Sequence, residues 1–128
     1  MAGIGISGIG QIHIPTSDQA RAIAFYRDVL GLPLLFEVPG MAFFKTGDVM
    51  LLLGPPAGPE FEHPASLIYY DVEDIDAACA ALTAANVEAI HESGVAHREP
   101  GRELWLAPFR DSEGNPFELR QWKSVEQA

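Results

Sequence analysis

The sequence has little cysteine, few cations and no long apolar run, and each shortage excludes a class of protein. Its single cysteine, Cys79, has no partner for an intrachain disulfide and cannot build a cysteine-based zinc site. Lys and Arg number 8 against 18 Asp and Glu, which gives a formal net charge of −10. This charge argues against a nucleic-acid partner, because phosphate contacts need clustered cations, and it disfavours an anionic membrane surface.

No segment has the length of a membrane helix or the pattern of a secretory signal. The longest apolar run, residues 49–53, is far shorter than the ~20 residues that cross a bilayer. The first residues lack a basic region, so a signal peptide is not predicted. Together with the lone cysteine, these features favour a reducing cytoplasm as the location.

The apolar share of 48% instead indicates one globular domain over residues 1–128, and its first half predicts a β-α-β-β-β unit over residues 8–53. Asp18 offers an N-cap for a helix that Gly31 ends. Within this helix Ala22, Phe25 and Tyr26 fall on one apolar face. The strands expected in this half are 9–14, 34–38, 41–45 and 49–53.

The proline- and glycine-rich segment 54–64 predicts a stiff linker, and the same pattern restarts after it over residues 65–123. Asp74 opens the second helix, which carries Cys79 on its apolar face. Residues 93–103 are expected to form an irregular, charged stretch. The strands expected in this half are 67–72, 87–91, 104–110 and 116–122.

Each half is too small to bury its own sheet, so we expect the two halves to pair. The predicted fold is α+β, with two βαβββ modules that form one curved eight-stranded mixed sheet and carry their helices outside. The concave face of such a sheet is a natural site for a small molecule.

Three motifs resemble those of the vicinal oxygen chelate superfamily. Residues 24–32 resemble its "FYxxVLGL" signature, residues 72–76 its "VxDID" segment and residues 109–119 its "FxDPDGNxxEL" ending. The resemblance implies the two-module fold of glyoxalase I, methylmalonyl-CoA epimerase, extradiol dioxygenases and bleomycin- and fosfomycin-resistance proteins. It also implies a homodimer, because single chains of this size in the family form dimers. The function is less specified, since this fold carries many chemistries.

The resemblance further implies four metal-ligand positions, which fall here at Gln11, Leu51, Leu67 and Glu118. The two leucines cannot bind a metal. His13 lies two residues after Gln11 on the same expected strand, so both side chains point to the same face. Gln11, His13 and Glu118 therefore form a depleted donor set for Mn, Ni, Zn or Fe, and the sequence favours a cavity without a metal.

Three functional interpretations stay open. In the first, the chain is a glyoxalase-like enzyme of the lyase or isomerase type, similar to lactoylglutathione lyase, that acts on a small carbonyl or carboxylate metabolite. Glu118 and His13 are then its acid and base. In the second, it is a metal-free small-molecule (drug) binding protein of the bleomycin-resistance type. In the third, it is a structural remnant with an occluded cavity, in which His13 and Glu118 only form a hydrogen bond with each other.

The remaining candidate ligand-binding residues follow from their positions in the pattern. Tyr69 stands to Leu67 as His13 stands to Gln11, and Leu51 and Leu67 make the expected wall mainly apolar. Arg98 and Arg102 are candidates to clamp a carboxylate or phosphate at the pocket mouth, with a solvated loop as the alternative. Trp105 either caps the pocket or belongs to the core.

Overall fold

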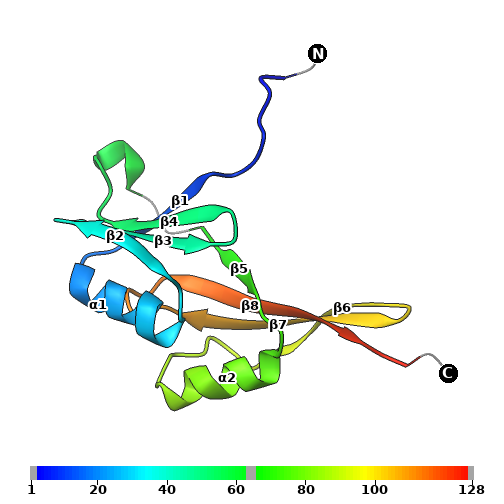
Figure 1. Cartoon of the computed structure of the whole chain (residues 1–128). Helices are drawn as coiled ribbons and strands as arrows, with labels where there is room; N and C mark the ends of the chain where they lie inside the picture. Colours follow the sequence, from blue (N-terminus) through cyan, green and yellow to red (C-terminus); the bar gives the residue numbers. More distant parts are fainter. Residues whose placement is uncertain (1–2, 63–65, 127–128) are drawn as a thin grey trace. The chain divides into compact units, whose positions relative to one another are not determined.

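The computed structural model describes residues 3–62 and 66–126, and the chain divides into unit 1 (residues 1–63) and unit 2 (residues 64–128) (Figure 1). Each unit holds a four-stranded mixed sheet. The strand orders, β1-β4-β3-β2 and β5-β8-β7-β6, are the same topology, because the first and last strands of each unit pair in parallel. The α+β fold of two βαβββ modules is thereby confirmed, but the strands form two four-stranded sheets, because the hydrogen-bonded ladders of the described residues stay within each unit, instead of the single eight-stranded sheet that was expected. No helix in the described part of the chain has the length and apolar character needed to span a membrane.

Unit 1 begins with β1 (Gln11–Pro15) and α1 (Gln19–Ala24). Asp18 caps α1, because its carboxylate accepts a hydrogen bond from the Arg21 backbone N–H at 3.1 Å. The helix continues as the π-helical turn η1 (Phe25–Val29) and ends before Gly31, whose φ of 75° suits glycine. The remaining strands are β2 (Leu34–Val38), β3 (Met41–Thr46) and β4 (Val49–Gly54).

The core of unit 1 lies between its sheet and the helical segment, because α1 packs against β3 and β4. The Tyr26 and Phe44 rings meet across this layer with their centroids 6.0 Å apart. The buried apolar side chains of the unit are Ile14, Ala22, Ile23, Phe25, Tyr26, Ala42, Phe44, Leu51 and Leu53.

Unit 2 repeats this plan after the short 3-10 helix η2 (Pro59–Phe61) of the linking segment. Asp74 caps the second helix as predicted, because its carboxylate accepts the Ala77 N–H at 3.1 Å. The helix packs against the two central strands of the sheet, which come last in the sequence. The elements are β5 (Ile68–Asp71), α2 (Ile75–Ala84), β6 (Gly94–Glu99), β7 (Arg102–Arg110) and β8 (Pro116–Ser124). The buried apolar side chains are Ile75, Leu82, Ala107, Phe109, Phe117 and Leu119.

The strand expected at residues 87–91 is wrong. That segment makes one isolated bridge, from Ala89 to Phe109, and the edge strand is β6 instead. β6 and β7 form a hairpin that turns at Gly101, whose φ is 89°. The stretch expected to be an irregular charged loop is therefore mostly strand. Its charges conceal the strand pattern because they pair across the hairpin, Arg98 with Glu103 and Arg102 with Glu99.

Candidate functional site

Each sheet has one face covered by its helix and one face that the helix does not cover, here called the helix-free face. In unit 1, Ile14 and Leu53 are paired and buried on the helix-covered face. Because side chains alternate along a strand, Gln11 and His13 point to the helix-free face. The strand register places Met50 opposite Gln11 and Leu52 opposite His13. Phe43 lies opposite Leu52 and extends the apolar part of this face.

Leu51, which the sequence placed on the wall of the site, lies on the helix-covered face. It is fully buried at 0% exposure and pairs with Phe44, whose ring meets Tyr26. The reason is a one-residue offset between the two units. Glu118 stands opposite Tyr69, and the corresponding pair in unit 1 is His13 with Leu52. A shift of one residue moves a side chain to the other face of a sheet, so Leu52 is the counterpart of Glu118.

His13 is half-buried and its ring is held by the backbone of β4. Its Nε2 donates a hydrogen bond to the Gly54 carbonyl at 2.8 Å. Because a carbonyl oxygen only accepts, this contact keeps the proton on Nε2 and leaves Nδ1 as the acceptor of the ring. One of the two ring nitrogens with which His13 could bind a metal is thus already engaged by a hydrogen bond within unit 1.

The helix-free face of unit 2 brings together two of the predicted site residues, Tyr69 and Glu118, and Leu67 lies one residue before β5. Phe117 and Leu119 are buried under α2, so Glu118 between them points to the helix-free face, directly opposite Tyr69. Leu67 precedes Tyr69 by two residues, and these two side chains are 44% and 46% exposed. The negative charge of half-buried Glu118 is the main cause that raises the pKa of the Tyr69 phenol, and burial and a hydrogen bond with Glu118 add to it.

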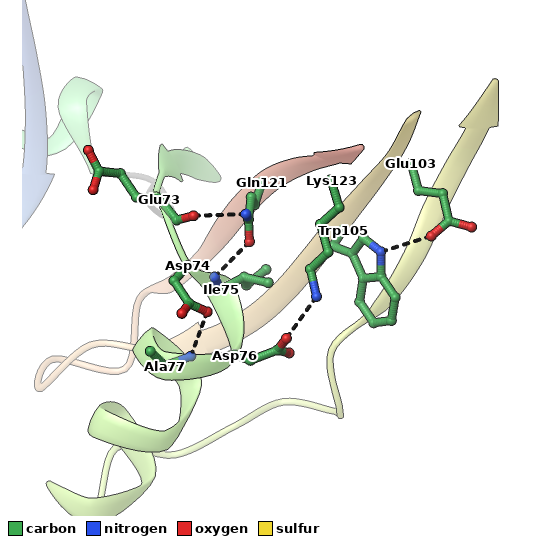
Figure 2. Close-up of polar contacts among 9 residues, drawn as sticks. All are labelled: Glu73, Asp74, Ile75, Asp76, Ala77, Glu103, Trp105, Gln121 and Lys123. Carbon is green, nitrogen blue, oxygen red and sulfur yellow. Dashed lines mark hydrogen bonds and ion pairs between the residues drawn. The ribbon is translucent and has the colours of Figure 1, made fainter. Parts of the chain in front are cut away.

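Trp105 lies on the helix-covered side of unit 2 (Figure 2). It stands opposite Gln121, and its Nε1 donates to the Glu103 carboxylate at 3.2 Å. The Lys123 ammonium lies 4.2 Å from the centre of the Trp105 ring and forms an ion pair with Asp76 of α2 at 2.8 Å. Of the two roles expected for Trp105, these contacts favour a structural one beside the helix.

The two arginine candidates lie on the β6–β7 hairpin, on opposite sides. Arg98 pairs with Glu103 at 2.9 Å on the side of Trp105. Arg102 pairs with Glu99 at 2.9 Å, and its guanidinium lies 3.7 Å from the centre of the Trp122 ring. Arg102 lies on the same face of the sheet as Glu118. It stands opposite Ser124, however, which at 3.4 Å per residue is ~20 Å from Glu118 along β8.

Two residues of the helix-free faces were missed from the sequence. Leu52 was overlooked because residues 49–53 are all apolar and show no alternation. Trp122 follows Glu118 by four positions on the same strand, and that spacing was the signal that places both side chains on one face.

A divalent metal does not fit the donors on these faces. Unit 1 supplies the Gln11 amide and the partly engaged His13 ring, with Met50 and Leu52 opposite them. Unit 2 supplies Glu118 and also Asp71, which shares the face of Tyr69 but is already paired with Arg120. Within residues 3–62 and 66–126, no three His, Cys, Asp or Glu side chains gather as a metal would require.

The comparisons with known proteins agree with this fold. Residues 8–119 match the model of the Glyoxalase/Bleomycin resistance protein/Dioxygenase superfamily. The structure is similar to TnmS3, an antibiotic binding protein from Streptomyces sp. CB03234, with 29% identity and a TM-score of 0.72 over 94% of this chain and 100% of that chain. It is also similar to lactoylglutathione lyase from Agrobacterium tumefaciens, with 27% identity and a TM-score of 0.67 over 90% of this chain and 93% of that chain.

The similarity to curated relatives is local. Metallothiol transferase FosB of Staphylococcus haemolyticus (strain JCSC1435) is 42% identical over 48 residues, which are 38% of this chain and 34% of that protein. The family match, in contrast, spans both βαβββ units. The chain therefore belongs to the Glyoxalase/Bleomycin resistance protein/Dioxygenase superfamily.

Proposed function

We propose that this chain binds a flat, largely apolar organic molecule without a metal, on the helix-free face of unit 2. The observation that carries the proposal is the pairing of Tyr69 with Glu118 on that face. The family ligand position nearest to this pair in unit 2 holds the aliphatic Leu67, and the exposed phenol ring of Tyr69 stands beside the carboxylate. These groups suit an apolar molecule and cannot complete a metal site.

The exposure of these side chains supports a binding role. An exposed aromatic ring gives a flat ligand a surface on which to stack. Covering roughly 100 Å² of apolar surface contributes about 2.5 kcal/mol, which is a substantial part of the affinity of a small ligand. The similarity to an antibiotic binding protein at 29% identity, over nearly the whole of both chains, points the same way.

Acridine, a flat tricyclic molecule that is uncharged at mildly alkaline pH, is a suitable probe. We expect saturable binding by calorimetric titration in the presence of a chelator. Tyr69→Ala removes the stacking surface and should weaken binding by about fivefold or more. Ile90→Ala, which shortens an exposed side chain outside the site, is the matched control and should leave the affinity unchanged. Equal affinities of the two variants argue against this face as the site.

A second candidate function is that of a glyoxalase-like lyase or isomerase. The Glu118 carboxylate and the protonated Tyr69 phenol form a pair that can take a proton beside a carbonyl and return one. The similarity to lactoylglutathione lyase supports this reading. The test is conversion of the hemithioacetal of methylglyoxal and glutathione. Turnover by the wild type that is lost in Glu118→Gln favours the enzyme, and no turnover by the wild type favours binding alone.

We also propose that the chain forms a homodimer. β2 is an edge strand of its sheet, and it exposes Leu35, Phe36 and Val38. An exposed apolar edge strand is a favourable place for a second chain to pair. Light scattering coupled to size-exclusion chromatography measures the mass directly, and a monomer at micromolar concentration contradicts the proposal.

A further inference from the structure

All cations in the described part of unit 2 are committed to carboxylates other than Glu118. Each of the arginines and the lysine of residues 66–126 has its own acidic partner. Glu118 belongs to none of these pairs. The pairs are Arg98–Glu103 at 2.9 Å, Arg102–Glu99 at 2.9 Å, Arg110–Glu88 at 3.1 Å, Arg120–Asp71 at 2.6 Å and Lys123–Asp76 at 2.8 Å.

Arg120 is the cation nearest to Glu118 in the sequence of β8, and strand alternation places it on the same helix-free face, two residues away. Its guanidinium donates to Asp71 of β5, the residue directly opposite it. Glu118 is left with the phenol of Tyr69, which supplies a hydrogen-bond donor and no positive charge. A carboxylate accepts several hydrogen bonds, so acceptor capacity remains on Glu118.

Within the described part of unit 2, Glu118 is thus a half-buried carboxylate that no Arg or Lys pairs with, and such a charge is stabilised by a cation brought to it. The metal that would offset this charge in related proteins does not fit here. We propose that the ligand supplies the countercharge itself, as a protonated nitrogen on a flat aromatic body. The nitrogen binds Glu118, and the ring stacks on Tyr69. This inference rests on the proposed binding function and names the chemical class of its ligand.

The net charge of the chain supports the same ligand class. At −10, the field of the protein draws cations toward it and repels anions. Selectivity for a cation nevertheless comes from the local contact, because a charge-assisted hydrogen bond to a half-buried carboxylate is stronger than an attraction to the exposed surface.

Two probes that share one ring system test the inference. 9-Aminoacridine is protonated at mildly alkaline pH, whereas acridine is uncharged there. We expect wild-type protein to prefer 9-aminoacridine. Glu118→Gln keeps the shape and removes the charge, so it should weaken 9-aminoacridine binding by about tenfold or more and leave acridine nearly unchanged. Glu60→Gln, on η2, removes one charge elsewhere and is the matched control.

The outcomes separate this inference from the function on which it rests. Equal binding of both probes by wild-type protein overturns the inference and leaves metal-free binding in place. A Glu118→Gln variant that keeps the preference for 9-aminoacridine also overturns it. Failure of both probes to bind contradicts the inference and the proposed function together. The comparison of the two probes on wild-type protein decides the matter even where the variant does not fold.

Discussion

Gln121 joins β8 to the beginning of α2 through both ends of its side-chain amide (Figure 2). Its Oε1 accepts the Ile75 backbone N–H at 2.8 Å, and its Nε2 donates to the Glu73 carbonyl at 2.8 Å. The Ile75 N–H lies in the first turn of the helix, where backbone donors have no partner within the helix. Because Ile75 is fully buried, the loss of Gln121 leaves this N–H poorly solvated.

We expect Gln121→Ala to lower the free energy of unfolding by about 2–3 kcal/mol. Each hydrogen bond contributes roughly 1 kcal/mol net, and a buried donor left without a partner adds a further cost of about 1 kcal/mol. For a chain of this length, 1 kcal/mol corresponds to a change in Tm of roughly 3–5 °C. The expected decrease in Tm is therefore about 6–15 °C.

Thermal unfolding followed by circular dichroism measures this effect. Gln11→Ala, which shortens an exposed glutamine on the helix-free face of unit 1, is the matched control and should change Tm by less than about 2 °C. Gln121→Glu keeps the acceptor and loses the donor, so its Tm should fall between the other two. A Gln121→Ala protein that melts together with Gln11→Ala refutes the reasoning.

Two further predictions test the assignment of side chains to faces and the chemistry of the core. Leu51→Ala should lower the free energy of unfolding by about 2–5 kcal/mol, and Leu52→Ala by clearly less, in urea denaturation; equal losses contradict the face assignment. Tyr70 has a buried hydroxyl with no hydrogen-bond partner among the described residues, so Tyr70→Phe should leave stability unchanged or raise it by about 1 kcal/mol at neutral pH. Burial, and then the charge of Asp111, raise the pKa of the Tyr70 hydroxyl in the folded protein above its ordinary value of 10.0. The unfolded chain therefore ionises first, so the free energy of unfolding of the wild type does not change through Tyr70 below pH 10 and falls as the pH rises further. Tyr70→Phe should therefore lose less stability than the wild type above pH 10, and an equal loss contradicts this cause.

The elements whose signals are local could be predicted from the sequence. Asp18 and Asp74 cap their helices because an N-cap depends on the few residues beside it. β2 was expected at 34–38 and is found there, because turn residues bound it on both sides. β6 was missed because its charged residues become a strand pattern only when they pair across a hairpin.

The faces of the candidate site depend on register, and that information is not local. Residues 49–53 are uniformly apolar, so only the pairing of β1 with β4 separates buried Leu51 from Leu52. Trp105 is equally compatible with either face until its register with Gln121 is known. The isolation of Glu118 from the cations of unit 2 follows from which carboxylate each arginine meets, and spacing in the sequence does not contain this.

The most direct test of the central claim is the affinity for acridine with and without divalent metal. The protein is stripped with a chelator and titrated, and the titration is repeated after addition of Mn, Ni or Zn. We expect saturable binding with the same affinity in all cases, because Tyr69 and Leu67 contact the ligand and no ion takes part. Binding that appears only after one of these metals is added, with the metal retained in stoichiometric amount, contradicts the proposal.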